Sequence, residues 1–205
     1  MAEPQLVADC FKAMQDAVDI DVTVKHRIGI DKVEDYGFVR DFVGTLYEAG
    51  VRTFIVHTRN AWLKGLSPKE NREVPPLRRE VAFDLKRDFP TATIVINGQV
   101  DTLELAEELL QKVDGVMMGR AAYKTPWVLS DVDARLFADM HPVASREELI
   151  EIMTRYIRRE TPADSHVPRA TAKAMIGLLQ GLAGARFYRR TLSDPAAFAE
   201  TGTEV

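Results

Sequence analysis

Two glycine-containing turns, each directly after a short apolar run, are the residues of this sequence best suited to hold an anion. Thr93 to Ile96 leads to Asn97-Gly98, and Val116 to Met118 leads to Gly119-Arg120. The backbone N–H of a glycine can approach a phosphate without interference from a Cβ atom, and Arg120 adds a fixed positive charge. A purely structural role is the alternative, because glycine commonly follows a strand.

The segment between these turns has the pattern of a helix. Apolar residues recur at helical spacing from Leu103 to Leu110, and Asp114-Gly115 ends the helix before the next apolar run. Strand, helix and strand therefore follow one another. In (β/α)8 barrels, the loops after the last two strands commonly bind phosphate. The sequence thus predicts a phosphorylated ligand held by Asn97, Gly98, Gly119 and Arg120.

Two further strand ends contribute side chains that could contact a cofactor. Residues 22–28 begin as a strand and include Lys25, His26 and Arg27. Because strand side chains alternate between faces, Lys25 and Arg27 project to one side and His26 to the other. Inside a barrel, Lys25 could meet a flavin ring or a phosphate, and solvation at a strand end is the alternative. His57 follows the strand Val51–Val56 and could hydrogen-bond a cofactor or cap the next loop.

Two basic segments contain aromatic residues. The loop from His57 to about Glu80 has no regular pattern, and it places basic residues around Trp62: Arg59, Lys64, Lys69, Arg72, Arg78 and Arg79. Near the C-terminus, GARFYRR repeats the combination at residues 184–190. Such segments suit a phosphodiester backbone and an unstacked base. A solvated loop is the alternative for the first segment, because Glu70, Glu73 and Glu80 dilute its charge.

The order of elements predicts an α/β protein. Strands are expected near residues 22–28, 52–57, 93–97 and 116–119, each joined to the next by a helix or by a loop and a helix. This alternation is typical of about four parallel strands with functional residues at their carboxyl ends. After Pro126-Trp127 the pattern is helical only, with helices expected after the capping sequence Ser145–Glu148 and over roughly 168–182. We predict a barrel-like domain at 1–140 and a small all-α domain at 141–205.

Composition narrows the classes of function. The 205 residues are 46% apolar with a net charge of −4, which argues against a globally basic nucleic-acid-binding protein but not against a local basic face. The absence of a run of about 18 apolar residues and of a signal region argues against membrane insertion and export. The single cysteine, Cys10, agrees with a reducing cytoplasm. We expect Cys10 to be a small core residue on the stripe of a helix over residues 4–19 rather than a catalytic thiol, and we predict no metal site.

Five stretches of the chain resemble one protein family. They are VTVKHRIGID, FIVHTRNAWLKGLSPKENREVPPL, VINGQVDT, DGVMMGRAAY and GLLQGLAGARFYRR. On these motifs the sequence is similar to the flavin-dependent tRNA-dihydrouridine synthases, and most closely to their A subfamily. The resemblance implies the C-terminal half of a (β/α)8 TIM barrel that holds FMN, followed by a helical tRNA-binding domain. It also implies reduction of the C5–C6 bond of D-loop uridines 20 and 20a with NADPH.

The resemblance assigns a role to individual residues. Lys25 and His57 become flavin contacts, and Asn97, Gly98, Gln99, Gly119 and Arg120 become contacts of the flavin phosphate. The tRNA contacts it implies are Lys69, Glu70, Arg72, Arg186 and Arg189. Gln99 stands where the family usually has glycine, so we expect strain if the position needs a positive φ.

The main departure from the family lies at the start of the chain. The family's catalytic cysteine belongs to a Cys-Pro-Ser stretch shortly before the segment that matches residues 1–4, so we expect no catalytic acid here and a truncated chain. Two alternative functions remain: a noncatalytic tRNA-binding remnant, or another FMN oxidoreductase with a small substrate. A partial barrel would leave two open sheet edges, which predicts self-association.

Overall fold

The computed structural model describes residues 1–139, 143–160 and 167–194, and its contacts divide the chain into two compact units. The first unit comprises Met1–Val100 and Glu104–Gly119, and the second comprises Asp101–Leu103 and Arg120–Val205. The domain boundary expected at 140/141 lies outside the described residues, so that division stays a prediction.

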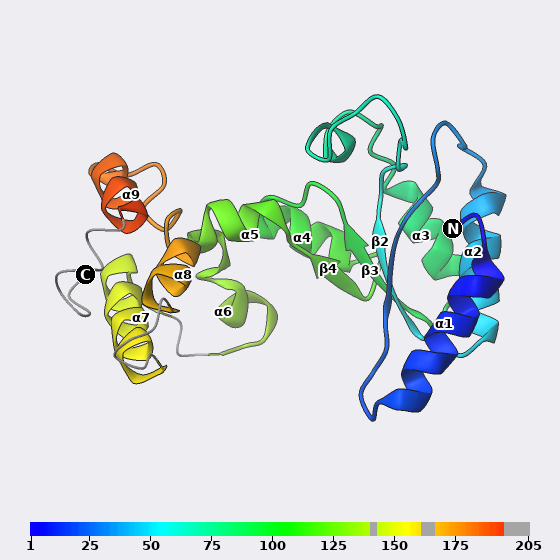
Figure 1. The fold of residues 1–205 in the computed structure, drawn as a ribbon, viewed down its shortest axis with the longest axis horizontal. Helices are drawn as coiled ribbons and strands as arrows, with labels where there is room; N and C mark the ends of the chain where they lie inside the picture. Colours follow the sequence, from blue (N-terminus) through cyan, green and yellow to red (C-terminus); the bar gives the residue numbers. More distant parts are fainter. Residues whose placement is uncertain (140–142, 161–166, 195–205) are drawn as a thin grey trace. The chain divides into compact units, whose positions relative to one another are not determined.

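The first unit is built on one parallel sheet with the strand order β1-β2-β3-β4. The strands are β1 Val24–Arg27, β2 Thr53–His57, β3 Thr93–Asn97 and β4 Gly115–Met117. The helices between them are α2 Tyr36–Glu48, α3 Glu80–Asp88 and α4 Leu103–Leu110, with α1 Pro4–Ala17 before β1 and the 3-10 turn η1 Glu70–Arg72 in the loop after β2 (Figure 1). The α/β architecture with parallel strands is confirmed.

One face of the sheet supplies the core. Phe54 and Val56 of β2 and Ile94 and Ile96 of β3 are fully buried. They belong to the same apolar cluster as residues from all three covering helices, among them Leu46, Leu85 and Leu109. The side chains that alternate with them, such as Ile55, His57, Val95 and Asn97, are only half-buried. The helices therefore cover one face and leave the other for a ligand or another part of a protein.

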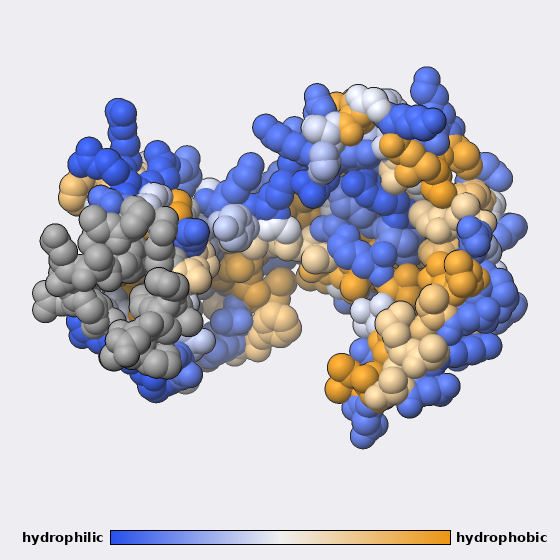
Figure 2. All heavy atoms as spheres, in the orientation of Figure 1, coloured by the Kyte–Doolittle hydropathy of each residue, from blue (hydrophilic) through white to orange (hydrophobic). Residues whose placement is uncertain are grey.

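Helix α1 differs from the prediction. Its buried residues are Ala8 and Phe11, whereas Cys10 is exposed, so the expectation that Cys10 is a core residue is wrong. Leu6 and Met14 of the same apolar stripe are more than half exposed. The reason is that α1 packs against α2 through the side that contains Ala8 and Phe11, and no described element covers the remainder. Apolar side chains are visible along α1 in Figure 2.

The described part of the second unit contains helices and turns without strands. Its elements are α5 Arg120–Lys124, η2 Pro126–Leu129, α6 Val132–Leu136, α7 Arg146–Glu160, α8 Val167–Ala174 and α9 Ala185–Ser193. The predicted capping of α7 is confirmed, because the Ser145 hydroxyl accepts from the N–H of Glu148 and the Glu148 carboxylate accepts from the N–H of Ala144.

The helix expected over 168–182 is shorter than predicted. It ends at Ala174, and turns with i to i+3 hydrogen bonds follow. Within these turns the backbone of Gly177 lies so close to the carbonyl of Lys124 that no room exists for a Cβ atom. None of the helices in the described ranges has the length and hydropathy needed to cross a membrane.

Candidate functional site

The carboxyl ends of the four strands lie side by side along one edge of the sheet. In the pairing register, Arg27 is opposite His57, His57 is opposite Asn97, and Asn97 is opposite Met117. Lys25 is one alternation earlier on the same face as Arg27, while His26 points to the other face and is 7% exposed. The predicted alternation of these three residues is confirmed.

A hydrogen-bonded chain connects the outer strands along this edge. The Lys25 ammonium donates to Asn97 Oδ1 at 3.1 Å, and Asn97 Nδ2 donates to the carbonyl of Met117 at 2.8 Å. Loss of solvent around the ammonium lowers the pKa of Lys25, and the positive charge of Arg27 lowers it further. A cation is thus held in a defined position on the open face of the sheet.

The turn after β3 has a backbone that its sequence only partly favours. Gly98 has φ +129°, and a Cβ there would lie 2.9 Å from the hydroxyl of Thr58. Gln99 also has a positive φ, +49°, which is the condition under which the sequence predicts strain at this position. Thr58 fixes the turn from the neighbouring strand end, because its N–H and hydroxyl both donate to the carbonyl of Asn97.

Two arginines hold Gln99 in this conformation. Arg59 donates from Nη2 to the Gln99 side-chain oxygen at 2.7 Å, and Arg79 donates to the Gln99 carbonyl at 2.9 Å. Arg59 is 6% exposed and also donates to the carbonyl of Pro75. The long loop after β2 is therefore joined to the turn after β3 through Gln99.

The same loop is anchored to β1. Arg27 Nη1 donates to the carbonyls of Asn60 and Asn71, at 3.2 and 3.0 Å. The Asn71 side chain contacts both backbone polar groups of Trp62, accepting from its N–H and donating to its carbonyl. Burial lowers the pKa of Arg27, and the nearby charges of Arg72 and Arg59 lower it further. These contacts keep an irregular loop in one arrangement.

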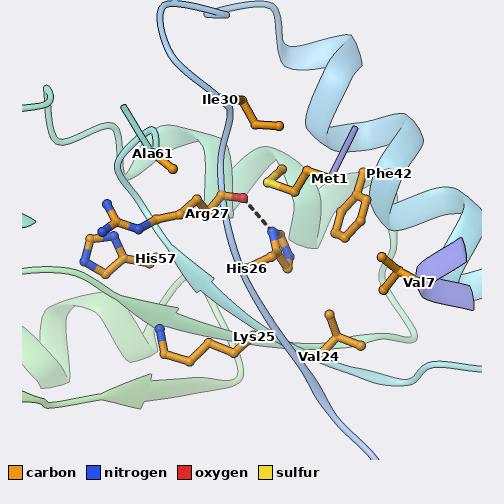
Figure 3. Close-up of a pocket in the computed structure, with 10 residues that line it drawn as sticks. All are labelled: Met1, Val7, Val24, Lys25, His26, Arg27, Ile30, Phe42, His57 and Ala61. Atoms are coloured by element: carbon orange, nitrogen blue, oxygen red, sulfur yellow. Dashed lines mark hydrogen bonds between the residues drawn. The ribbon is translucent and has the colours of Figure 1, made fainter. Parts of the chain in front are cut away.

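A cavity of about 440 Å³ lies along the edge strand β1 and is lined by residues from both faces of that strand. Figure 3 shows Lys25 and His57 on one side of the strand and Met1, Val7 and Phe42 on the other. His26 lies next to the rings of Phe42 and Phe54, at centroid distances of 5.3 and 6.1 Å. One end of the cavity is therefore polar and the other apolar.

Comparisons with known proteins place this arrangement in a family. The family model described as dihydrouridine synthase (Dus) matches residues 1–205. The chain belongs to the dihydrouridine synthase family. Three of its relatives are called tRNA-dihydrouridine(20/20a) synthase. The one from Vibrio vulnificus is 49% identical, over 100% of this chain and 63% of the relative. The relatives from Pseudomonas syringae pv. tomato and Yersinia pestis are 52% and 50% identical over 94% and 100% of this chain.

The chain spans about three fifths of the length of these curated relatives, 57% and 59% for the last two. Dihydrouridine synthases are a family of TIM-barrel enzymes, in which each strand is followed by a helix around a closed sheet. The four parallel strands and their covering helices in this chain are a part of that architecture. The fold class predicted from the sequence is therefore confirmed by the family and by the sheet.

The structure brings together some of the residues predicted for a dihydrouridine synthase. Lys25, His57, Asn97 and the turn at Gly98-Gln99 lie at the strand ends of the first unit. Gly119 follows β4, and an added Cβ there would meet no atom within 4 Å. Arg120 is the next residue in the chain and begins α5 of the second unit.

The residues predicted to contact tRNA fall into both units. Lys69, Glu70 and Arg72 are at η1 of the first unit, and Arg186 and Arg189 are in α9 of the second. Glu70 has a local role as well, because its carboxylate accepts from the N–H of Ser67 at 2.8 Å. The Ser67 hydroxyl, and after it this backbone hydrogen bond, lower the pKa of Glu70.

Sequence reasoning missed the residues that organise the loop. Arg27 was identified only by its strand face, Arg59 only as one of several cations, and Asn60 and Asn71 were not identified. The Asn60 amide donates to the carbonyls of Asp31 and Val33, at 3.0 and 2.8 Å. An available signal was that asparagine often hydrogen-bonds to the backbone in loops.

Proposed function

We propose that this chain is part of a tRNA-dihydrouridine(20/20a) synthase, an enzyme that uses FMN and NADPH to reduce D-loop uridine to 5,6-dihydrouridine. The name given to relatives about 50% identical supports the reaction and the RNA substrate. The structural observation on which the proposal depends is the Lys25–Asn97 hydrogen bond beside the Gly98 turn, at the common end of the strands.

The residues present fit the proposed cofactor. At Gly119, open space exists where a Cβ would lie, so a phosphate could approach the backbone there. Among the described residues, the N–H groups of Gly98, Gln99 and Gly119 donate no hydrogen bond. In this proposal residues 97–99 and Gly119-Arg120 bind the phosphate, and Lys25 and His57 contact the ring system. When bound, FMN supplies the hydride for the reduction.

Lys25 has two proposed tasks at the ring. Its ammonium would supply a positive charge beside the ring system, which would stabilise the negative charge of a reduced flavin. Its hydrogen bond to Asn97 limits the positions that the flexible side chain can take. Both tasks require the cation and the amide together, so loss of Asn97 should reduce cofactor affinity even though Lys25 is retained.

The tRNA is proposed to contact two basic segments. Lys69, Glu70 and Arg72 lie on a loop that Arg27 and Asn71 already hold in place, so less conformational entropy is lost when RNA binds. Arg186 and Arg189 of α9 are the second segment. The proposed reaction occurs in the cytoplasm, and neither DNA nor a membrane has a role in it.

No residue of this chain is proposed as the proton donor. Cys10 is the only cysteine, and it lies on α1 rather than at the carboxyl ends of the strands. Strands β1 and β4 both leave an edge of the sheet unpaired within the described residues. We therefore propose that the isolated chain self-associates, which sedimentation velocity over a range of concentrations would test.

Flavin titration tests the proposed function. Lys25→Ala and Asn97→Ala should weaken FMN binding by about tenfold or more, because a hydrogen bond to a charged group contributes about 1.5–3 kcal/mol. Lys12→Ala on α1 is the matched control and should bind FMN as the unaltered chain does. Quenching of flavin fluorescence gives the affinities. Equal affinity for the Lys25→Ala and Lys12→Ala variants would contradict the role of Lys25.

A parallel tRNA titration separates the alternatives. An unaltered chain that binds tRNA but not FMN would indicate a noncatalytic RNA-binding protein. A chain that binds FMN but not tRNA would indicate a flavin oxidoreductase with a small substrate. Binding of both is the expected result.

A further inference from the structure

The second unit has a cavity of its own, with a volume of about 420 Å³. It lies where the end of α5 meets the turns after α8 and the helix α9. Its lining residues are Tyr123, Lys124, Thr125, Lys173, Ile176, Gly177, Gln180 and Arg189. The volume is within the range of about 300–1,000 Å³ that small-molecule sites occupy.

All charged side chains that line this cavity are positive. Three of its lining residues, Lys124, Lys173 and Arg189, are cations, and none is a carboxylate. Among the described residues, neither lysine has an ion-pair partner, while Arg189 donates to the side-chain oxygen of Gln180. Three cations around one hollow repel each other, and an anion placed among them would remove that repulsion. The cavity is therefore suited to a phosphate.

The sequence concentrates positive charge in the segment that contains α8 and α9. Residues 167–194 contain five basic residues, Arg169, Lys173, Arg186, Arg189 and Arg190, and one acidic residue, Asp194. The neighbouring segment 143–160, which contains α7, has four of each sign. The helices α7 and α8 pack together, so the two segments of different charge are neighbours in the unit. The cations of the cavity are thus part of a local excess.

An aromatic ring lies beside these cations. The Tyr123 side chain lines the cavity and is 69% exposed, so a ligand can reach the ring. The backbone around the cavity is fixed, because Gly177 contacts the carbonyl of Lys124 and the Thr125 hydroxyl donates to the carbonyl of Ala121. A ring of this kind can stack on a nucleobase whose phosphate is bound nearby.

We propose that this cavity binds one nucleotide of an RNA chain, with its phosphate at Lys124, Lys173 and Arg189 and its base against Tyr123. The inference rests on the proposed function, because that function makes RNA the polymer present. It adds a discrete pocket on the second unit to the contacts already proposed for α9, and it assigns Tyr123, Lys124 and Lys173 to substrate binding.

Salt dependence of tRNA binding tests the charged and the aromatic contributions separately. Lys124→Ala and Lys173→Ala should each reduce the slope of log affinity against log salt by about one, because each removes one phosphate contact. Tyr123→Ala should weaken binding by roughly 5- to 100-fold at every salt concentration and leave the slope unchanged, because stacking is not ionic. Tyr123→Phe should retain the affinity. Fluorescence anisotropy with the full chain gives both quantities.

Arg155→Ala is the matched control, since Arg155 is an exposed cation of α7 that is paired with Glu151. It should change neither the slope nor the affinity, and circular dichroism should show all variants folded. The inference is overturned if the Lys124, Lys173 and Tyr123 variants bind tRNA as the Arg155 variant does. In that case the proposed function still stands, provided that the unaltered chain binds FMN and tRNA.

Uridine 5′-monophosphate serves as a probe for a free nucleotide. Competition between this probe and tRNA, lost in the Tyr123→Ala variant, is the expected result. Tight binding of the probe to a chain already saturated with tRNA would show that the cavity takes a free nucleotide and would overturn the inference. Failure of the unaltered chain to bind tRNA at any salt concentration would overturn both this inference and the proposed function.

Discussion

The strand ends of the first unit and the cavity of the second unit hold their positive charges in different ways. In the first, Lys25, Arg27, Arg59 and Arg79 each donate hydrogen bonds to other parts of the protein. In the second, Lys124 and Lys173 line the cavity, and neither ammonium has a hydrogen-bond or ion-pair partner among the described residues. Fixed cations suit a cofactor that must be held in one orientation. Solvated cations suit a nucleic acid, because they can displace the counterions from its phosphates.

The difference has a thermodynamic consequence. A cation that the protein already orients loses little entropy when a ligand arrives, so its contribution is mainly geometric and changes little with salt. A solvated lysine must be ordered on binding, and its attraction to phosphate is screened by salt. Changes in the first region should therefore alter stability and orientation, and changes in the second should alter salt-dependent affinity.

The largest effect is expected at the floor of the second cavity. Gly177→Ala would place a Cβ far inside van der Waals distance of the carbonyl of Lys124, so the backbone must move. We expect a loss of about 3 kcal/mol or more in the free energy of unfolding, at the upper end for overpacking. Urea unfolding followed by Trp127 fluorescence in a Trp62→Phe background reports on the second unit alone.

Gly181→Ala is the control for Gly177→Ala. Gly181 has φ +85° but no atom within 4 Å of an added Cβ, so only the cost of a left-handed residue applies, about 1–2 kcal/mol. Equal losses for the two variants would show that the contact with Lys124 does not limit this cavity.

A pH-dependent effect of similar size is expected in the first unit. Burial lowers the pKa of His26 to about 4, against the opposing hydrogen bond to the carbonyl of Arg27. Between pH 6.5 and about 4, the unfolded chain binds a proton that the folded chain does not. Stability is therefore complete above pH 6.5 and falls with decreasing pH by at most about 1.4 kcal/mol per pH unit.

His26→Met removes the titrating group, so the difference between the unfolding free energies at pH 7 and pH 5 should become smaller. Urea unfolding of both proteins at the two pH values, followed by Trp62 fluorescence, measures it. An unchanged pH dependence in the variant would show that another group is responsible.

Removing an anchor of the loop after β2 should make its cations less fixed, as they are in the cavity of the second unit. Asn71→Ala removes both contacts of this side chain with the backbone of Trp62, at a local cost of about 1–2 kcal/mol. Trypsin should then cleave after Lys64, Lys69 and Arg72 roughly tenfold faster, because local opening becomes easier. Asn71→Asp can accept from the N–H of Trp62 but cannot donate to its carbonyl, so it should be intermediate. Equal cleavage rates would contradict the anchoring role.

Some of these features could be predicted from the sequence and others could not. The strands were predicted to within about two residues, because β-branched runs and the glycines that end them are local signals. The bonds from Arg27 to Asn60 and Asn71 connect residues 33 and 44 positions apart, and no local pattern specifies such pairs. The stripe on α1 was identified correctly as apolar, yet periodicity does not say whether a neighbour covers it.

The smallest effect on stability, and the sharpest test of how the first region is held together, is expected at Gln99. Gln99→Gly relieves the strain of φ +49°, about 1 kcal/mol, but removes the acceptor of the Arg59 bond, about 1–2 kcal/mol. The two terms nearly cancel in urea unfolding. Gln99→Ala keeps the strain and loses the bond, so it should be less stable than Gln99→Gly by the cost of the strain. If the two variants are equally stable, the positive φ is not strained. If Gln99→Gly leaves tryptic cleavage of the loop unchanged, Arg59 does not need Gln99 to join the loop to the proposed phosphate turn.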